Sequence, residues 1–275
     1  MSISPIKYIS LMKYHLEYVP NLLKQYSKVF TWKQKKNLRI VDIGSGPGNL
    51  LAKMEPHFPQ QYKEIIALDK EIDMVNYFNA VPKDPRISAR QLDIEISEIP
   101  DDLKNRFDFA FSCMCFHYAE DICKAFKNSS QLLRTNGESF FIWCKISHIY
   151  NVYKYLSKIE KWATYTNDFK NWNNHFDNDN PLITVEKEFN KFGLKILKSE
   201  ELNDIYYEEE KAEYFFDVLN SLDSVSGRIP KYDLQKYKAD FNKGVLTQLI
   251  VEKTDSGFKH KLHAPTLVVA SKKTN

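Results

Sequence analysis

Residues 41–48, Val-Asp-Ile-Gly-Ser-Gly-Pro-Gly, combine the residue types of a ligand-binding loop. Gly44 and Gly46 allow positive φ and a close approach of a ligand to the backbone, and the helix predicted to follow Gly48 would offer free N–H groups. A dinucleotide loop would follow the pattern Gly-x-Gly-x-x-Gly, whereas this loop has no such spacing and Asp42 lies in the strand before it. The loop therefore favours a ligand with an ammonium group and no pyrophosphate. A tight structural turn is the alternative.

Two further acids follow predicted strands. Asp69 comes directly after the apolar run 65–68, where its carboxylate could accept both hydroxyls of a ribose; an N-cap of the next helix is the alternative. Asp93 follows the run 86–92 and could accept a hydrogen bond from an adenine amino group while Ile94 packs on the ring. The alternative for Asp93 is the cap of a loop. Because parallel strands end at one edge of a sheet, the loop and the two acids together predict one nucleoside site.

The elements that would hold these residues alternate between strands and helices. Short apolar runs predict strands at 38–43, 65–68, 86–92, 107–111 and 139–144, with a turn at Asn136-Gly137. Apolar residues at helical spacing predict helices at 49–55, 72–78 and 122–133. This alternation predicts an α/β fold with a doubly wound, mostly parallel sheet that is covered on both faces.

The flanking segments predict additional helices around this sheet. Residues 6–30 predict two short helices or one helix kinked at Pro20. After the fifth strand, the pattern predicts helix and then loop at 146–180, helix at 185–192, one strand at 195–207, helix at 210–243 with a break at 227–230, and strands at 246–251 and 262–270. Since 210–245 is too long for a simple crossover, we expect it to cap the carboxyl edge of the sheet. We expect one domain, divided into a helical lid (1–34), a core (35–145), acceptor-side helices and cap (146–245) and C-terminal strands (246–275).

Composition argues against several classes of protein. The 39 basic and 36 acidic residues are mixed along the chain, and a net charge of +3 gives no basic stripe for nucleic acid. No apolar run approaches the ~18 residues of a membrane helix, and lysines interrupt the N-terminus where a signal peptide would be apolar, so a cytoplasmic protein is expected. Cys113 and Cys115 alternate on a hydrophobic strand and no CxxC pair exists, which predicts free thiols and no metal site.

Taken together, the loop Asp42–Gly48, Asp69, Asp93-Ile94 and the strand 107–112 resemble the methyl-donor motifs of class I methyltransferases. The resemblance covers about 35–145. It implies a seven-stranded, Rossmann-like sheet with S-adenosylmethionine as the methyl donor. The positions that it assigns to donor binding are Asp42, Gly44, Ser45, Gly46, Gly48, Asp69, Lys70, Asp93, Ile94 and Ser112.

Within that superfamily, the chain resembles the insect juvenile hormone acid methyltransferases. The segments that carry this resemblance are Phe116-His117-Tyr118, 125–126 and 132–137, with a weaker match around Trp32 and at Lys161-Trp162. It implies O-methylation of a small apolar carboxylic acid of the farnesoic or juvenile hormone type. That family has a glutamine in its N-terminal helix that contacts the carboxylate, whereas no glutamine precedes Gln25 here and His15 falls near that place. Tyr8 stands where the family has an aromatic residue, and His117-Tyr118 replaces a His-Trp pair.

The acceptor decides whether a base is needed. A carboxylate is already ionised at neutral pH, so alignment and the exclusion of water would suffice. A phenol or alcohol would need a general base, and His15 and His117 are the candidate catalytic residues; a structural hydrogen bond is the alternative for His117. His15 could also bind an acid as a neutral ring, or as a cation below its usual pKa of ~6.5. The residues predicted to contact the acceptor are Tyr8, His15, Phe116, Tyr118 and Trp143, with aromatic walls from 146–176 that include Trp162 and Trp172.

Two other classes remain open on the sequence alone. A protein or nucleic-acid methyltransferase would be expected to carry an Asn/Asp-Pro-Pro-aromatic motif after the fourth strand, where this chain has Ser-Cys-Met-Cys-Phe at 112–116. A non-catalytic subunit would be expected to have degraded donor motifs, and these are intact. The sequence therefore predicts an enzyme acting on a small molecule, as a monomer or homodimer, without a nucleic-acid or membrane partner.

Overall fold

The computed structural model describes residues 4–59, 61–169, 176 and 178–274. Its main sheet has seven strands in the order β3-β2-β1-β4-β5-β10-β6. The strands are β1 (Arg39–Ile43), β2 (Glu64–Asp69), β3 (Ile87–Gln91), β4 (Phe107–Cys113), β5 (Leu133–Cys144), β6 (Leu194–Leu202) and β10 (Thr266–Lys273). Strands β1 to β5 pair in parallel, and β10 is antiparallel to both of its neighbours. The predicted doubly wound, mostly parallel sheet is confirmed.

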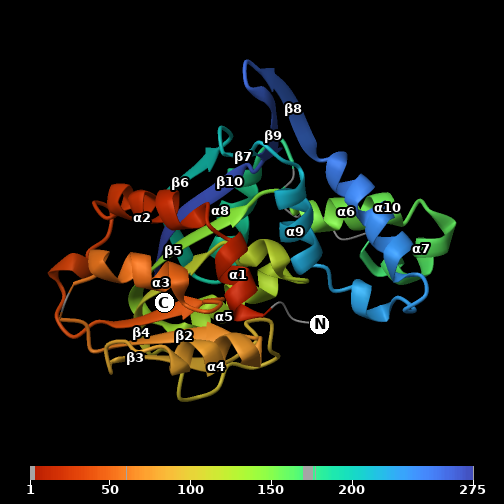
Figure 1. Cartoon of the computed structure of the whole chain (residues 1–275). Coiled ribbons are helices and arrows are strands. Elements are labelled where there is room, and N and C mark those ends of the chain that lie inside the picture. Colours follow the sequence, from red (N-terminus) through yellow and green to blue (C-terminus); the bar gives the residue numbers. More distant parts are fainter. Residues whose placement is uncertain (1–3, 60, 170–175, 177, 275) are drawn as a thin grey trace.

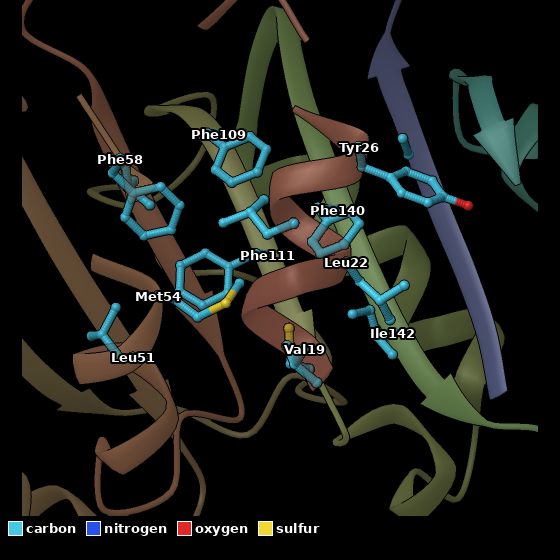
Figure 2. Close-up of a cluster of buried hydrophobic side chains, with 14 of the residues drawn as sticks. Val19, Leu22, Tyr26, Leu51, Met54, Phe58, Phe109, Phe111, Phe140 and Ile142 are labelled. Atoms are coloured by element: carbon cyan, nitrogen blue, oxygen red, sulfur yellow. The ribbon is translucent and has the colours of Figure 1, made fainter. Parts of the chain in front are cut away.

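Helices cover both faces of this sheet because its strands are apolar on both sides. On one face, Figure 2 shows Val19, Leu22 and Tyr26 of α2 (His15–Tyr26) and Leu51 and Met54 of α3 (Asn49–Met54) packed over Phe109, Phe111, Phe140 and Ile142. On the other face, α5 (Ile122–Leu132) and α8 (Pro181–Lys191) pack on Phe141 and Trp143. Alternate residues of β5 thus belong to different cores, as the two-residue repeat of a strand requires. Helix α4 (Ile72–Ala80) follows β2.

The N-terminal segment forms two helices, α1 (Pro5–Leu11) and α2, as predicted. Ser4 caps α1 and Pro5 occupies its first turn, a position where the missing N–H of proline costs nothing. The break between the helices lies at 12–14 and not at Pro20, which is buried inside α2. The break is held by tertiary contacts. The Tyr14 hydroxyl donates to the Glu208 carbonyl and to Oε1 of Glu209, and Lys13 pairs with Glu209.

The predicted turn at Asn136-Gly137 lies inside β5, so that prediction was wrong. Asn136 has a φ of 63°, and the pairing of β4 with β5 shifts between Phe107↔Leu133 and Phe109↔Glu138. The extra residues are therefore absorbed as a bulge, a place where left-handed backbone is common. The residues predicted as a turn therefore belong to β5, which begins at Leu133, directly after α5 ends at Leu132.

A second, three-stranded sheet has the order β7-β9-β8, built from β7 (Tyr206–Glu209), β8 (Leu249–Thr254) and β9 (Gly257–His263). The single strand predicted at 195–207 is instead divided between β6 and β7. Pairing of β6 with β10 stops at Leu202↔Thr266, after which the chain crosses to the second sheet. Strand β9 runs into β10 with only Ala264 and Pro265 between them. One continuous stretch of chain thus joins the two sheets.

The predicted helical regions after β5 form a layer with its own core. Its helices are α6 (His148–Leu156), α7 (Glu160–Thr166), α9 (Glu213–Ser221) and α10 (Leu234–Leu246), with a break between α9 and α10 that contains η5 (Ser226–Arg228). In Figure 1, α6, α7 and α10 lie together to the right of the sheet, and α9 lies beside α1. The core of this layer includes Tyr153, Trp162 and Phe241. Trp162 is buried and donates to Asp240 at 3.0 Å, while Trp172 lies outside the described residues.

The remaining short turns of 3-10 helix are η1 (Trp32–Gln34), η2 (Glu55–His57), η3 (Phe116–Tyr118) and η4 (Asn167–Phe169). Of these, η3 follows β4 and reaches the candidate site at the carboxyl edge of the sheet. No helix in the described part of the chain has the length and apolar character to cross a bilayer.

Candidate active site

A cavity of about 380 Å³ lies at the carboxyl ends of β1, β2 and β3, and we call it the donor cavity. Most of the residues predicted to bind the donor line it, although they come from three separate loops. They are Gly44, Gly46, Asp69, Lys70, Asp93 and Ile94. On its far side the cavity is lined by Tyr150 and Tyr153 of α6 and by Ser221 and Leu222 at the end of α9. The predicted cap therefore does cover this edge of the sheet.

The glycines of the loop are required by close packing. Gly44 has a φ of 73°, and a Cβ there would lie 2.1 Å from Sγ of Cys115. Gly48 has a φ of 86°, and a Cβ there would lie 2.4 Å from the ring of Phe78 on α4. Gly48 therefore allows α3 to pack against α4, and Gly44 keeps the loop tight against the end of β4.

Asp69 lies at the edge of the donor cavity, and the N-cap of α4 is Glu71 and not Asp69. Its carboxylate lines the donor cavity, and it also accepts hydrogen bonds from the backbone N–H of Gly46 at 2.7 Å and of Glu71 at 2.9 Å. Burial raises the pKa of Asp69, and the two N–H donors oppose that shift. Asp93 likewise lines the cavity and caps its loop, because Oδ1 accepts from the N–H of Glu95 at 2.9 Å.

Asp42 is buried next to the donor cavity. It lines a small adjoining cavity of about 20 Å³ together with Gly44, Ser45 and Tyr8. Burial, reinforced by the charge of Asp69, raises the pKa of Asp42 well above its usual value. No described residue forms an ion pair with it. A buried carboxylate without a cationic partner is costly to ionise.

Tyr8 of α1 covers the glycine loop. It lines the donor cavity and the small cavity, and a Cβ on Gly46 would lie 3.6 Å from its ring. Burial raises the pKa of the Tyr8 phenol, so the group stays protonated. The structure thus places Tyr8 on the donor side, whereas the resemblance had associated it with the acceptor.

A second cavity of about 70 Å³ adjoins the donor cavity, and we call it the histidine chamber after His15, His117 and His148. The two cavities share Met114 and Tyr118 after β4, Ile149 of α6 and Leu222 after α9. The other walls of the chamber are mainly apolar or aromatic, and include Leu11, Met12, Tyr207, Tyr214, Phe215 and Leu219. The chamber is therefore an apolar space that opens beside the predicted site of methyl transfer.

The three histidines are neutral at pH 7 because burial lowers their pKa values. The pKa falls to about 4 for His15, about 3 for His117 and about 4 for His148. Nδ1 of His15 lies 3.3 Å from the Tyr207 hydroxyl, and Nδ1 of His117 accepts from the N–H of Cys144 at 3.4 Å. Among the described residues that line the chamber, none is Lys, Arg, Asp or Glu. Its polar groups are thus neutral hydrogen-bonding groups.

Four predicted site residues line none of the three cavities, namely Gly48, Ser112, Phe116 and Trp143. Phe116 and Trp143 are buried on the opposite face of the sheet, where they contact Phe126 of α5. The physical reason is the alternation along β5, which turns Trp143 away from the side on which Cys144 meets the chamber. Ser112 is fully buried in β4, and its hydroxyl donates to the carbonyl of Ile43 at 2.8 Å.

Several residues of the site had no signal in the sequence. His148 and Tyr207 line the chamber from α6 and β7, two elements that only the fold brings together. Met114 has a φ of 61°, which is unusual for a residue other than glycine, and it lies in the wall between the two cavities. Such strain is common at functional sites. Cys115 lines the donor cavity as a thiol, since burial raises its pKa to about 12.

Comparison with known proteins agrees with this geometry, because residues 40–137 match the methyltransferase domain family. This matched segment contains the glycine loop, Asp69 and Asp93. The chain is 30% identical over 173 residues to a juvenile hormone acid O-methyltransferase of Bombyx mori, and 27% identical over 154 residues to one of Drosophila melanogaster. These alignments cover 62% and 55% of this chain, and they span 62% and 52% of the relatives' own length.

The solved structures show the same architecture. A protein of Bacillus halodurans described as a candidate methyltransferase is 13% identical, with a TM-score of 0.55 over 92% of this chain and 99% of that chain. This similarity concerns the fold alone. The seven-stranded sheet and its flanking helices form the Rossmann-like class I methyltransferase fold.

Proposed function

We propose that this protein uses S-adenosylmethionine to methylate a carboxyl oxygen of a small apolar acid. The observation that carries the proposal is the shared wall at Met114 and Tyr118, which separates a cavity lined by the donor motifs from an apolar chamber lined by neutral histidines. The two curated relatives act, by their names, on juvenile hormone acid. We infer that the acceptor of this chain is an acid of the same chemical class.

The residues of the donor cavity fit S-adenosylmethionine. The buried carboxylate of Asp42, which has no described ion-pair partner, would hold the ammonium group. Asp69 would accept the ribose hydroxyls, and Asp93 with Ile94 would hold the adenine. When bound, the donor supplies a methyl group on a positively charged sulfur. The chain contributes the binding groups and the orientation of the donor.

The histidine chamber would hold and orient the acceptor. Its apolar walls suit a hydrocarbon chain, and its few polar groups would fix the carboxyl end near the shared wall. With a pKa of about 4, His15 would act on the acid as a neutral hydrogen-bond donor at pH 7 and not as a cation. Excluding water from this chamber would favour the reaction of an oxygen anion with a cationic methyl donor.

A panel of acceptors tests this proposal. We would incubate the protein with labelled donor and with farnesoic acid, fatty acids, the matching alcohols, a phenol and an amine. We expect label only with the acids, in a product that alkali hydrolyses, because a methyl ester is alkali-labile and an ether or methylamine is not. Methylation of only the phenol or the amine would contradict the acid proposal. A protein that binds no donor would favour the non-catalytic alternative.

The variant His15→Ala tests the role of the chamber. It removes one neutral donor to the acid, so we expect the acceptor KM to rise about tenfold or more. The Kd of the donor should change less, although His15 also lines the small cavity with Asp42. His57→Ala, which removes an exposed histidine outside both cavities, is the matched control. Full activity of His15→Ala toward every acid methylated by the wild type would remove His15 from the proposal.

A further inference from the structure

Asp223, in the segment between α9 and α10, has a buried carboxyl group that joins three parts of the helical layer. Its Oδ1 accepts hydrogen bonds from the Tyr153 hydroxyl of α6 at 3.0 Å and from the Tyr237 hydroxyl of α10 at 3.2 Å. The same oxygen accepts from the backbone N–H of Val225 at 2.9 Å and of Ser226 at 3.3 Å. The residue is only 4% exposed. One buried oxygen atom thus connects α6, α10 and the chain that follows α9.

Residues 222–226, which we call the cap turn, depend on side chains for their conformation. The N–H of Ser224 donates to the Tyr153 hydroxyl at 3.0 Å, and the next two N–H groups along the chain donate to Asp223. Three consecutive backbone donors therefore have side-chain acceptors. Because buried N–H groups need an acceptor, and because Asp commonly supplies one to the N–H two residues later, the cap turn is held by Asp223 and Tyr153.

The residues held by Asp223 form part of the donor cavity. Tyr153 and Ser224 both line this cavity, and so do Ser221 and Leu222, which come directly before Asp223. Asp223 itself lines none of the three cavities. Any effect of Asp223 on a ligand must therefore pass through its neighbours.

A carboxyl group is a costly choice for packing alone at this place. Burial raises the pKa of Asp223, and the N–H and hydroxyl donors oppose that shift. Its Oδ2 is buried and has no hydrogen-bond partner among the described residues. An apolar side chain would avoid this cost but could not accept the four hydrogen bonds. An asparagine could accept them, because its amide oxygen can take the place of Oδ1.

We propose that Asp223 is a positioning residue for the methyl donor, because it holds Tyr153 and the cap turn where they form the far wall of the donor cavity. The proposal rests on the proposed function, since it needs the donor to occupy this cavity. Without Asp223, the Tyr153 hydroxyl and the cap turn would have to become ordered when the donor binds. This ordering would reduce the binding free energy, although the glycine loop, Asp69 and Asp93 are unchanged.

Asp240 of α10 provides a matched comparison in the same helical layer. It is also buried, and its carboxylate accepts from the Trp162 indole at 3.0 Å and from Lys243 at 2.9 Å. None of these three residues lines any of the three cavities. Asp223→Ala and Asp240→Ala should both lower the Tm, because each leaves a buried donor without its acceptor. Only Asp223→Ala should weaken donor binding.

Calorimetric titration of the full chain with S-adenosylhomocysteine, the donor without its methyl group, measures this difference without any reaction. We expect the Kd to rise about tenfold in Asp223→Ala and to stay within about twofold of the wild-type value in Asp240→Ala. In Asp223→Asn, which keeps the accepting oxygen, the Kd should stay within about threefold of the wild-type value.

A pair of tyrosine variants tests the same link with a smaller change. Tyr153→Phe and Tyr237→Phe each remove one hydroxyl that donates to Oδ1 of Asp223, but only Tyr153 lines the donor cavity. We expect the Kd to rise about fivefold in Tyr153→Phe and less than about twofold in Tyr237→Phe. Combining Asp223→Ala with Tyr153→Phe should add little to the effect of Asp223→Ala, because both changes break the same link.

The possible results separate the two proposals. Wild-type affinity in Asp223→Ala, or an equal loss of affinity in Asp240→Ala, would refute the positioning role. An Asp223→Asn variant as weak as Asp223→Ala would assign the effect to charge and would also refute it. If Asp223→Ala does not fold, the tyrosine variants decide, and equal affinities in those two variants refute the role. If the wild type binds no S-adenosylhomocysteine, the proposed function itself fails, and this inference fails with it.

Discussion

The donor cavity and the histidine chamber adjoin, but they are built in different ways. The donor cavity takes its polar groups from loops that follow β1, β2 and β3, and much of its shape comes from backbone held by glycine. The chamber is assembled from side chains of α2, η3, α6, β7 and α9, which meet only after the chain has folded. The shape of the donor cavity is thus fixed by local backbone geometry, and the shape of the histidine chamber by the arrangement of distant elements. Substitutions should therefore act on the two ligands separately.

The largest expected effect comes from Gly44→Ala. The new Cβ would collide with Sγ of Cys115 at 2.1 Å, on backbone with a φ of 73°. Strain and overpacking should weaken donor binding about 100-fold, equivalent to ~3 kcal/mol, as measured by calorimetry. Gly257→Ala is the matched control, since Gly257 also has a positive φ but no atom lies within 4 Å of its Cβ position. Equal donor affinity in the two variants would break the claim that backbone shapes the donor cavity.

Asp69→Ala should have the next largest effect on the donor. Removal of the carboxylate would leave ribose hydroxyls unpaired and free the N–H of Gly46, which costs about 1–3 kcal/mol of binding free energy. Donor titration would measure the loss, and acid binding in the absence of donor should not change. Asp101→Ala, at a side chain that is 95% exposed, serves as control. An unchanged donor Kd in Asp69→Ala would refute the placement of the ribose.

Asp42→Asn should change stability and donor binding in opposite directions, because it should raise the Tm without donor and weaken the binding of the donor. Since the pKa of Asp42 is raised in the folded protein, its contribution to stability is present below its unfolded pKa of 3.8 and is lost as the pH rises through the folded value. Asparagine carries no such cost, so at pH 7 without donor we expect Tm to rise by roughly 2–4 °C, equivalent to about 1 kcal/mol.

The same variant should bind the donor less well, because the ammonium group loses its buried partner. Thermal unfolding from pH 3 to pH 8 checks the sign, since the gain in Tm should shrink toward acid pH. A variant that is less stable than the wild type at pH 7 and equally stable at pH 3 would contradict this account of Asp42.

Trp143→Phe should have the smallest effect on the reaction. Trp143 lies on the far side of the sheet from the histidine chamber, so the acceptor KM should stay within about twofold of the wild-type value, whereas loss of buried volume should lower stability by about 1–2 kcal/mol. Steady-state kinetics and thermal unfolding measure the two quantities. A large rise in the acceptor KM at unchanged Tm would contradict this prediction and indicate that Trp143 contacts the acceptor.

The sequence could predict the parts that depend on contiguous residues. The strands β1 to β4, their helices and the order of Gly44, Asp69 and Asp93 follow from local patterns, and the structure brings those three residues to one cavity. The bulge at Asn136 was missed because Asn-Gly ordinarily forms a turn. The division of 195–207 into β6 and β7 depends on where pairing with β10 ends, which no local pattern records.

The chamber was predictable only in part. The resemblance pointed to His15, His117 and Tyr118, and all three line it. Phe116 and Trp143 were assigned to the acceptor, but both pack in the core on the other face. For Trp143 the strand is continuously apolar, so its sequence does not say which face is which. His148 and Tyr207 could not be paired with them, because their proximity depends on the second sheet.

The direct passage of β9 into β10 has a consequence for how a ligand reaches the chamber. Leu262 lines the chamber and Leu267, five positions later, pairs with Trp143 in the main sheet, so this wall cannot swing without disturbing the sheet. The chamber is also lined by Leu11 of α1, a helix in which no residue is fully buried and whose end is held by Tyr14, Glu209 and Tyr214. We therefore expect α1 to be displaced when an apolar acid enters the chamber and when its ester leaves. The rate of turnover would then depend on how often the contacts of Tyr14, Glu209 and Tyr214 break.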